Sequence, residues 1–248
     1  MAKYHSKLWD AVKFEVLNAS GSDDELVDEA LLTIRSIATS LAHGLQDIPQ
    51  RDSPLSRYLK PIIKECSELL LEPQQKQAKP AGQILASILR AGPVPRAYII
   101  RDTLPTLLTI YDEAEGIIKQ RAMLEVLNHI FESAVLGYGD CGSLEVYPTL
   151  GIPLAEFKDR LFDIYSKALM STNKDEVGFR IVALKGLGAL CGIQKLFTDS
   201  EVGMVVQYLD EIVLEKEEEA REETRYVFLI LQSSRKANGI DYKSEEKH

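Results

Sequence analysis

The chain has 248 residues, of which 45% are hydrophobic, so it is long enough to bury a substantial core. Its formal net charge of -9 argues against a nucleic-acid partner, because such partners are bound largely by Lys and Arg side chains that neutralise phosphates. No stretch approaches the roughly 20 apolar residues of a membrane span, and the N-terminus carries no secretory signal. We therefore expect no membrane association and a cytoplasmic and nuclear location.

Hydrophobic residues recur at three- and four-residue intervals along nearly the whole chain, which is typical of α-helices. The clearest early helix follows Ser22, a capping residue, and ends at Gly44. The next opens with Ser53 and Pro54 and closes at Pro73. Eight further helices are predicted, approximately over residues 5–18, 75–91, 94–111, 114–136, 153–171, 175–192, 199–215 and 217–236.

The longest gap between predicted helices covers residues 137–153 and holds four Gly and two Pro. Its Gly-rich beginning, residues 137–142, resembles a phosphate-binding loop only superficially, because it lacks the Gly-Lys-Ser/Thr ending and follows a helix instead of a strand. We interpret the gap as a loop insertion.

A period of about 40 residues runs through the predicted helix pairs, as in HEAT and armadillo arrays. In the second helix of a pair, a basic residue is followed by small or apolar residues at fixed spacing. First helices repeat too, since Pro61 and Pro105 stand 44 residues apart. The recurring basic residues are Lys79, Lys119, Arg180 and Arg221.

These patterns predict an all-α fold: a single HEAT-type α-solenoid over residues 1–248, with the loop insertion at 137–153. We expect about five repeats, or ten antiparallel helices, in a right-handed superhelical stack, each pair stabilised by its neighbours. The first helix, with Leu8, Trp9 and Phe14, is apolar around much of its circumference. We therefore expect the chain to have been cut from a longer solenoid, with exposed ends capable of self-association.

The sequence contains no recognisable catalytic, cofactor or metal site. Cys66, Cys141 and Cys191 form no Cys-x-x-Cys pair, and Cys66 and Cys191 fall in apolar helical patterns where buried thiols are common. No His stands in a nucleophile or zinc motif; the four are His5, His43, His129 and His248. We therefore predict that the chain is not an enzyme and binds other proteins, through a face that the sequence does not identify. The four recurring basic residues either contact partners or link neighbouring repeats.

Several stretches resemble one particular family, the large HEAT-repeat targeting subunit of cytosolic iron-sulfur protein assembly, called MMS-nineteen or Met-eighteen. The stretches are Leu8-Trp9 with Glu15-Val16, Ile63-Lys64-Glu65-Cys66 to Glu72-Pro73, Lys79-Pro80-Ala81, Phe157-Lys158-Asp159-Arg160-Leu161, and Val177-Gly178-Phe179-Arg180 through Leu187-Gly188. The resemblance implies an internal fragment of an adaptor that binds a WD40 subunit and a small cluster-handling subunit. Such an adaptor helps to deliver iron-sulfur clusters to apo-proteins of DNA replication and repair, the iron-sulfur client enzymes.

Two other functions stay open at this point. A HEAT-repeat transport receptor or a phosphatase-type regulatory scaffold would show the same helical repeats. An enzyme that uses the loop around Cys141 is the third reading.

Overall fold

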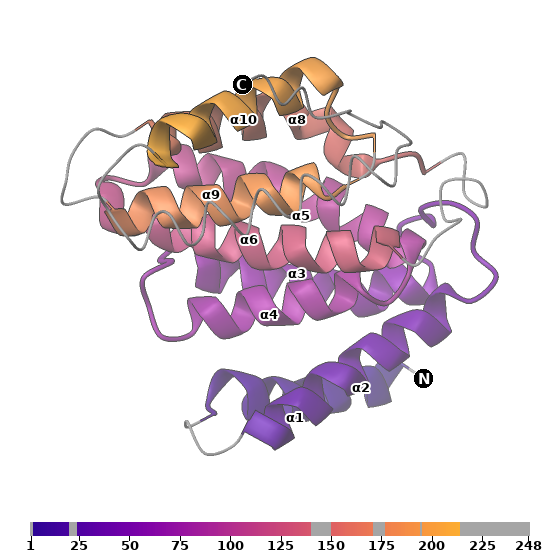
Figure 1. Ribbon diagram of the computed structural model, residues 1–248. Helices are drawn as coiled ribbons and strands as arrows, with labels where there is room; N and C mark the ends of the chain where they lie inside the picture. The colour runs from indigo at the N-terminus through magenta and orange to yellow at the C-terminus, as the bar shows by residue number, and fades with distance from the viewer. Residues whose placement is uncertain (1, 20–23, 140–149, 171–176, 194, 214–248) are drawn as a thin grey trace. The chain divides into compact units, whose positions relative to one another are not determined.

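The computed structural model describes residues 2–19, 24–139, 150–170, 177–193 and 195–213 (Figure 1). Within these ranges the chain forms nine α-helices and one 3-10 helix and no strand, which confirms the all-α prediction. The chain divides into two compact units, Met1–Phe157 and Lys158–His248. The repeat number, the superhelical stack and the organisation as a single solenoid stay predictions.

The first unit contains six α-helices and a short 3-10 helix. They are α1 (Ala2–Leu17), α2 (Asp24–Ala42), α3 (Pro54–Leu70), α4 (Ala78–Leu89), α5 (Pro93–Glu113), α6 (Ile117–Gly139) and η1 (Pro153–Phe157). The second unit contains α8 (Lys158–Leu169), α9 (Val177–Cys191) and α10 (Asp199–Val213). Among the described residues, no helix is both long enough and apolar enough to cross a membrane.

Helix ends follow the capping chemistry that the sequence predicts. The Ser53 hydroxyl accepts a hydrogen bond of 3.0 Å from the backbone N–H of Ser56, and Pro54 occupies the first turn of α3. Gly44, just beyond α2, has a φ of 79°, a left-handed conformation that glycine adopts without steric cost. Ser22, the predicted cap of α2, lies outside the described residues.

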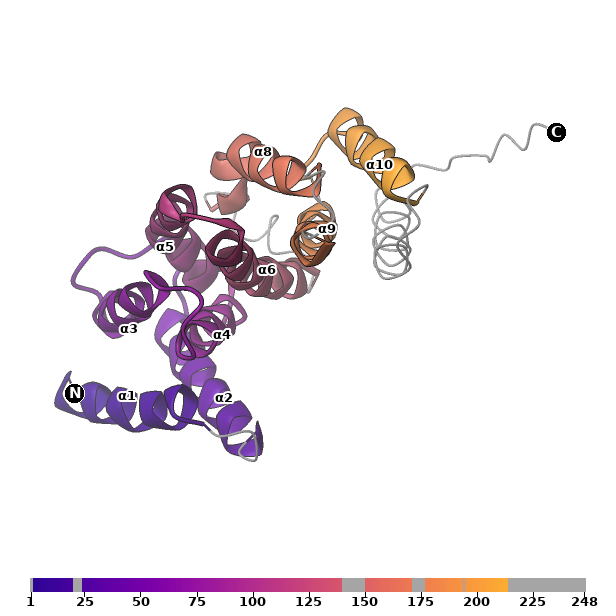
Figure 2. The ribbon, with the colours of Figure 1, turned by 90° about the vertical axis from the view of Figure 1, so that its left-hand side faces the viewer.

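In the first unit, consecutive helices pack in pairs, α1 with α2, α3 with α4 and α5 with α6. The second helices of these pairs also lie next to one another, α2 against α4 and α4 against α6, and α3 lies against α5. Figure 2 shows α3 and α5 on one side and α4 and α6 on the other. The two-layer arrangement of first and second helices in this unit is consistent with an α-solenoid.

Small side chains link the neighbouring second helices. The Ser87 hydroxyl of α4 donates a hydrogen bond of 2.8 Å to the Leu31 carbonyl of α2. The Thr39 hydroxyl of α2 in turn donates one of 2.9 Å to the Ala91 carbonyl, just after α4. The two bonds follow the same chain order in both segments, so they hold α2 beside the C-terminal end of α4 and parallel to it.

Apolar residues from all three helix pairs form the core of the first unit. Its fully buried large side chains include Ile34, Leu55, Leu59, Ile62, Leu70, Ile84, Leu85, Ile88, Leu89, Ile99 and Phe131. Burying each such side chain contributes roughly 1.5–3 kcal/mol relative to leaving it exposed. Because these residues come from α2 to α6, the helix pairs depend on one another for their stability.

In the second unit, α8 packs against α9. The Phe162 and Phe197 rings meet edge to face, with their centroids 5.8 Å apart. Thr198 and Glu201 form a reciprocal capping box at the start of α10, where the Glu201 carboxylate accepts a 2.7 Å bond from the Thr198 backbone N–H. Glu201 also pairs with Lys158 at 2.7 Å, so it joins the start of α8 to the start of α10.

The structure corrects two predicted boundaries around the loop insertion. Helix α6 continues to Gly139, so the loop does not begin at residue 137. The segment predicted as helical from residue 153 starts as the 3-10 helix η1, and the α-helical geometry of α8 begins only at Lys158. The predicted helix over 217–236 lies outside the described residues.

Candidate interaction surfaces

The residues with catalytic or metal-binding chemistry do not converge in the described part of the chain. His43 is exposed just after α2, and His129 lies on α6 with its Nδ1 atom 4.0 Å from a Glu132 carboxylate oxygen. His5 lies on α1, and His248 and Cys141 fall outside the described residues. Among the described residues, no group of three or more His, Cys, Asp or Glu is placed to hold a metal ion.

The two described cysteines are buried in helices, as the sequence predicted. Cys66 lies on α3, and Cys191 is the last residue of α9. Burial raises the pKa of the Cys66 thiol well above its ordinary value, and the neighbouring Glu65 carboxylate raises it further. A buried thiol of this kind packs as a small hydrophobic side chain.

The recurring basic residues differ from one another in their surroundings. Lys119, in the first turn of α6, pairs with Glu72, in the turn between α3 and α4, at 3.2 Å. Arg180 is buried in α9, whereas Lys79 is exposed on α4. Arg221 lies outside the described residues. At Lys119, therefore, the recurring position links neighbouring helix pairs.

The ion pair between Glu72 and Lys119 is flanked by large exposed aliphatic side chains. Leu71, next to Glu72, is 59% exposed, and Ile118, next to Lys119, is 79% exposed. Ile117 is also exposed. The ion pair holds the two chain segments together, so these residues share one edge of the first unit. We call Leu71, Glu72, Ile117, Ile118 and Lys119 the turn-edge patch.

The turn-edge patch has the composition of a protein-binding surface. Large aliphatic groups release water when a partner covers them, and the charged groups beside them can fix the orientation of that partner. Lys119 holds the pKa of the Glu72 carboxyl below its usual value through a hydrogen bond, with help from the Gln74 side chain. Glu72 is thus a carboxylate at neutral pH.

Sequence reasoning did not identify this patch. Ile118 directly precedes the recurring Lys119, and an apolar residue at such a helical position is typical of the core. Leu71 directly follows Leu70, the last residue of α3, which is fully buried. The one available signal was the basic repeat itself, because Lys119 marks the place where two neighbouring helix pairs meet.

No protein-family model matches the chain. Curated proteins do match it, over most of its length. They include the "DNA repair/transcription protein mms19" of Schizosaccharomyces pombe, which is 29% identical over 210 residues, 84% of this chain and 20% of that protein. The "MMS19 nucleotide excision repair protein homolog" of Danio rerio is 26% identical over 226 residues, 88% of this chain and 21% of the relative.

A third relative is the DNA repair/transcription protein of Saccharomyces cerevisiae that is called Met-eighteen or MMS19. It is 24% identical over 233 residues, which cover 84% of this chain and 21% of the relative. The resemblance found in the sequence is therefore confirmed. The chain spans about a fifth of the length of the curated relatives it matches.

Proposed function

We propose that this chain, a relative of the MMS19 proteins, is a protein-binding scaffold that serves DNA repair and transcription. The process is taken from the names of its relatives, which are DNA repair/transcription proteins. The turn-edge patch is a candidate binding surface on this chain, because Leu71 and Ile118 expose apolar area next to the two residues of the Glu72–Lys119 ion pair.

The finer proposal is that the scaffold is an adaptor of the cytosolic iron-sulfur targeting complex. In this role it binds a WD40 subunit, a small cluster-handling subunit and iron-sulfur client enzymes, and it acts in the cytoplasm and nucleus. The iron-sulfur cluster is cargo held by other proteins. The burial of Cys66 and Cys191 supports this division of labour, because neither thiol is presented at the surface of the described residues.

A scaffold of this kind works by surface complementarity. In the first unit, its helix pairs are fixed to one another by buried apolar contacts and by the Ser87 and Thr39 bonds that join α2 to α4. A rigid helical frame keeps exposed side chains in place before the partner arrives, which lowers the entropy cost of binding. The same frame can hold two partners at a fixed separation.

Binding of purified partners tests the proposal. We expect the chain to bind the WD40 subunit, the small cluster-handling subunit or an apo client enzyme in an interferometry experiment. The double variant Leu71→Asp/Ile118→Asp should weaken that binding by about tenfold or more, since apolar anchors dominate protein interfaces.

Leu136→Asp is the matched control, because Leu136 is 56% exposed on α6 and is not part of the patch. It should bind like the unmodified chain. A chain that binds none of these partners, but binds a nuclear-transport GTPase or a phosphatase catalytic subunit, would refute the iron-sulfur proposal in favour of the other scaffold classes.

A further inference from the structure

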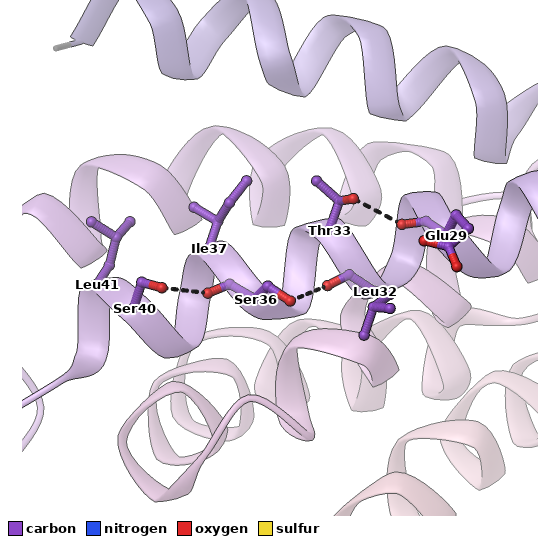
Figure 3. Close-up of a pocket in the computed structure, with 7 residues that line it drawn as sticks. All are labelled: Glu29, Leu32, Thr33, Ser36, Ile37, Ser40 and Leu41. Carbon is purple, nitrogen blue, oxygen red and sulfur yellow. Dashed lines mark hydrogen bonds between the residues drawn. The ribbon is translucent and has the colours of Figure 1, made fainter.

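The outward face of α2 carries a shallow depression that no other described helix lines. It is bordered by seven residues of α2: Glu29, Leu32, Thr33, Ser36, Ile37, Ser40 and Leu41 (Figure 3). Ser36 and Ser40 are small and exposed. Leu32 stands on one side of them, whereas Ile37 and Leu41 point to the other side. The depression is therefore a short groove with apolar walls and a floor of small residues.

The hydroxyl groups of this groove already have hydrogen-bond acceptors within α2. Thr33 donates to the Glu29 carbonyl at 2.9 Å, Ser36 to the Leu32 carbonyl at 2.8 Å, and Ser40 to the Ser36 carbonyl at 2.9 Å. A protein surface that covers the groove thus does not need to replace hydrogen bonds for these donors. Small side chains also allow another helix to approach closely.

The opposite side of α2 shows that such an approach occurs in this fold. There α4 lies alongside α2, and its small residue Ser87 contacts the α2 backbone. The outward groove offers a similar mixture of small hydroxyl residues and aliphatic residues. A second helix in this groove would continue the lateral packing that already joins α2 to α4.

The outward face of α2 is complementary to itself when two copies run antiparallel. Glu29 and Ser36 are seven residues apart, or two helical turns, so they lie on one face of α2, and His43 follows after seven more residues, directly beyond the helix end. A two-fold axis at Ser36 places the Glu29 carboxylate of each copy opposite His43 of the other. His43, which is exposed, can donate a hydrogen bond to that carboxylate.

The same two-fold axis also brings apolar side chains of the two copies into contact. Leu32 lies four residues before Ser36, and Ser40 lies four residues after it. Leu32 of one copy therefore meets the other copy at Ser40, between Ile37 and Leu41. Leu32 is 41% exposed on its own, so this contact removes apolar area from water.

We propose that the groove on α2 is a homodimer interface, in which α2 packs antiparallel on α2 of a second copy about a two-fold axis at Ser36. The contact is isologous, with each copy supplying both the Leu32 side chain and the groove that receives it. One helix per copy forms a smaller interface than the roughly 1,200–2,000 Å² of stable complexes, so we expect a dissociation constant on the order of micromolar or weaker.

Sedimentation velocity over a concentration series that brackets this range tests the proposal on the full chain. We expect a monomer–dimer equilibrium, with Leu32→Glu raising the dissociation constant by about tenfold or more. Leu136→Glu introduces the same charge at an exposed leucine of α6 and should leave the equilibrium unchanged. Both variants should melt within a few degrees of the unmodified chain, because both sites are exposed.

Charge reversal tests the antiparallel register. Glu29→Lys should weaken the dimer, because it removes the carboxylate that accepts the hydrogen bond from His43, and the double variant Glu29→Lys/His43→Glu should restore it, since each new pair joins opposite charges. Cross-linking then tests the axis: in a Cys141→Ser background, Ser36→Cys should be joined by a short bismaleimide, whereas Leu136→Cys should not. A chain that stays monomeric at every concentration, or a dimer that is insensitive to Leu32→Glu and to both charge variants, would overturn the proposal.

Discussion

Gly82 of α4 lies directly against Val126 of α6: a Cβ atom at position 82 would stand 3.3 Å from a Val126 Cγ atom. Both residues belong to second helices of neighbouring pairs, and Val126 is buried. A helix-interior glycine costs roughly 0.5–1 kcal/mol relative to alanine. In return, the missing side chain lets α4 and α6 approach closely.

Replacing Gly82 with a large residue should therefore push α4 and α6 apart. We expect Gly82→Leu to lower the free energy of unfolding by about 1–3 kcal/mol, because the added side chain meets Val126. Urea denaturation measures the change. The double variant Gly82→Leu/Val126→Ala should recover part of the loss, and equal stability of Gly82→Leu and the unmodified chain would show that α4 and α6 are not closely packed here.

A second prediction concerns the buried bond between the first helices. The hydroxyls of Ser56 on α3 and Tyr98 on α5 lie 2.8 Å apart, and Ser56 is fully buried. Tyr98→Phe should cost about 1–3 kcal/mol, because it leaves the Ser56 hydroxyl without this partner in the core. Thermal or urea unfolding provides the measurement.

The matching control removes both groups. In Ser56→Ala/Tyr98→Phe no polar atom of this pair is left unpaired, so the double variant should be more stable than Tyr98→Phe alone. If the double variant loses as much stability as the two single variants added together, the hydroxyls do not interact.

The titration of Glu72 is the third prediction. Lys119 lowers the pKa of this carboxyl in the folded state. The pair thus stabilises the fold above the ordinary pKa of an unfolded glutamate, and this contribution disappears as the pH falls through the lowered, folded-state pKa. Its size is small because the pair is exposed to solvent.

Carboxyl NMR of the folded chain measures this pKa directly. In the Lys119→Met variant the Glu72 midpoint should move up towards the ordinary glutamate value. An unchanged midpoint would show that Lys119 does not contact Glu72 in solution.

Helix positions were predictable because they depend on local chemistry. The Ser53 cap and the Gly44 terminus act through the backbone of their own turns, and apolar periodicity marks the buried face of α3. The end of α6 was not predictable in this way. Glycines usually signal a loop, yet the helix includes Gly137 and Gly139 because a glycine in a helix costs only about 1 kcal/mol.

The turn-edge patch could not be predicted because it depends on contacts between distant segments. Glu72 and Lys119 are 47 residues apart, and nothing in either segment alone indicates that they pair. Ile118 has the character of a core residue, but the start of α6 leaves it exposed. Exposure is decided by the stacking of helix pairs, which local sequence patterns do not specify.

Thiol reactivity gives a fourth prediction. In a Cys141→Ser variant, Ellman's reagent should react with Cys66 and Cys191 only slowly in native buffer and rapidly in guanidinium. Both thiols are buried, and burial raises the pKa of Cys66, which disfavours the reactive thiolate. Fast labelling of either thiol in native buffer would show that its helix opens readily, and would remove the argument that the chain does not present its cysteines to a cluster.

Hydrogen–deuterium exchange of the chain, alone and saturated with the WD40 and small cluster-handling subunits, is the most direct test of the scaffold proposal. We expect the backbone amides around Leu71 and Ile118 to exchange more slowly in the complex, with smaller changes on α2. Unaltered exchange around both residues when the partners are bound would contradict the role proposed for the turn-edge patch.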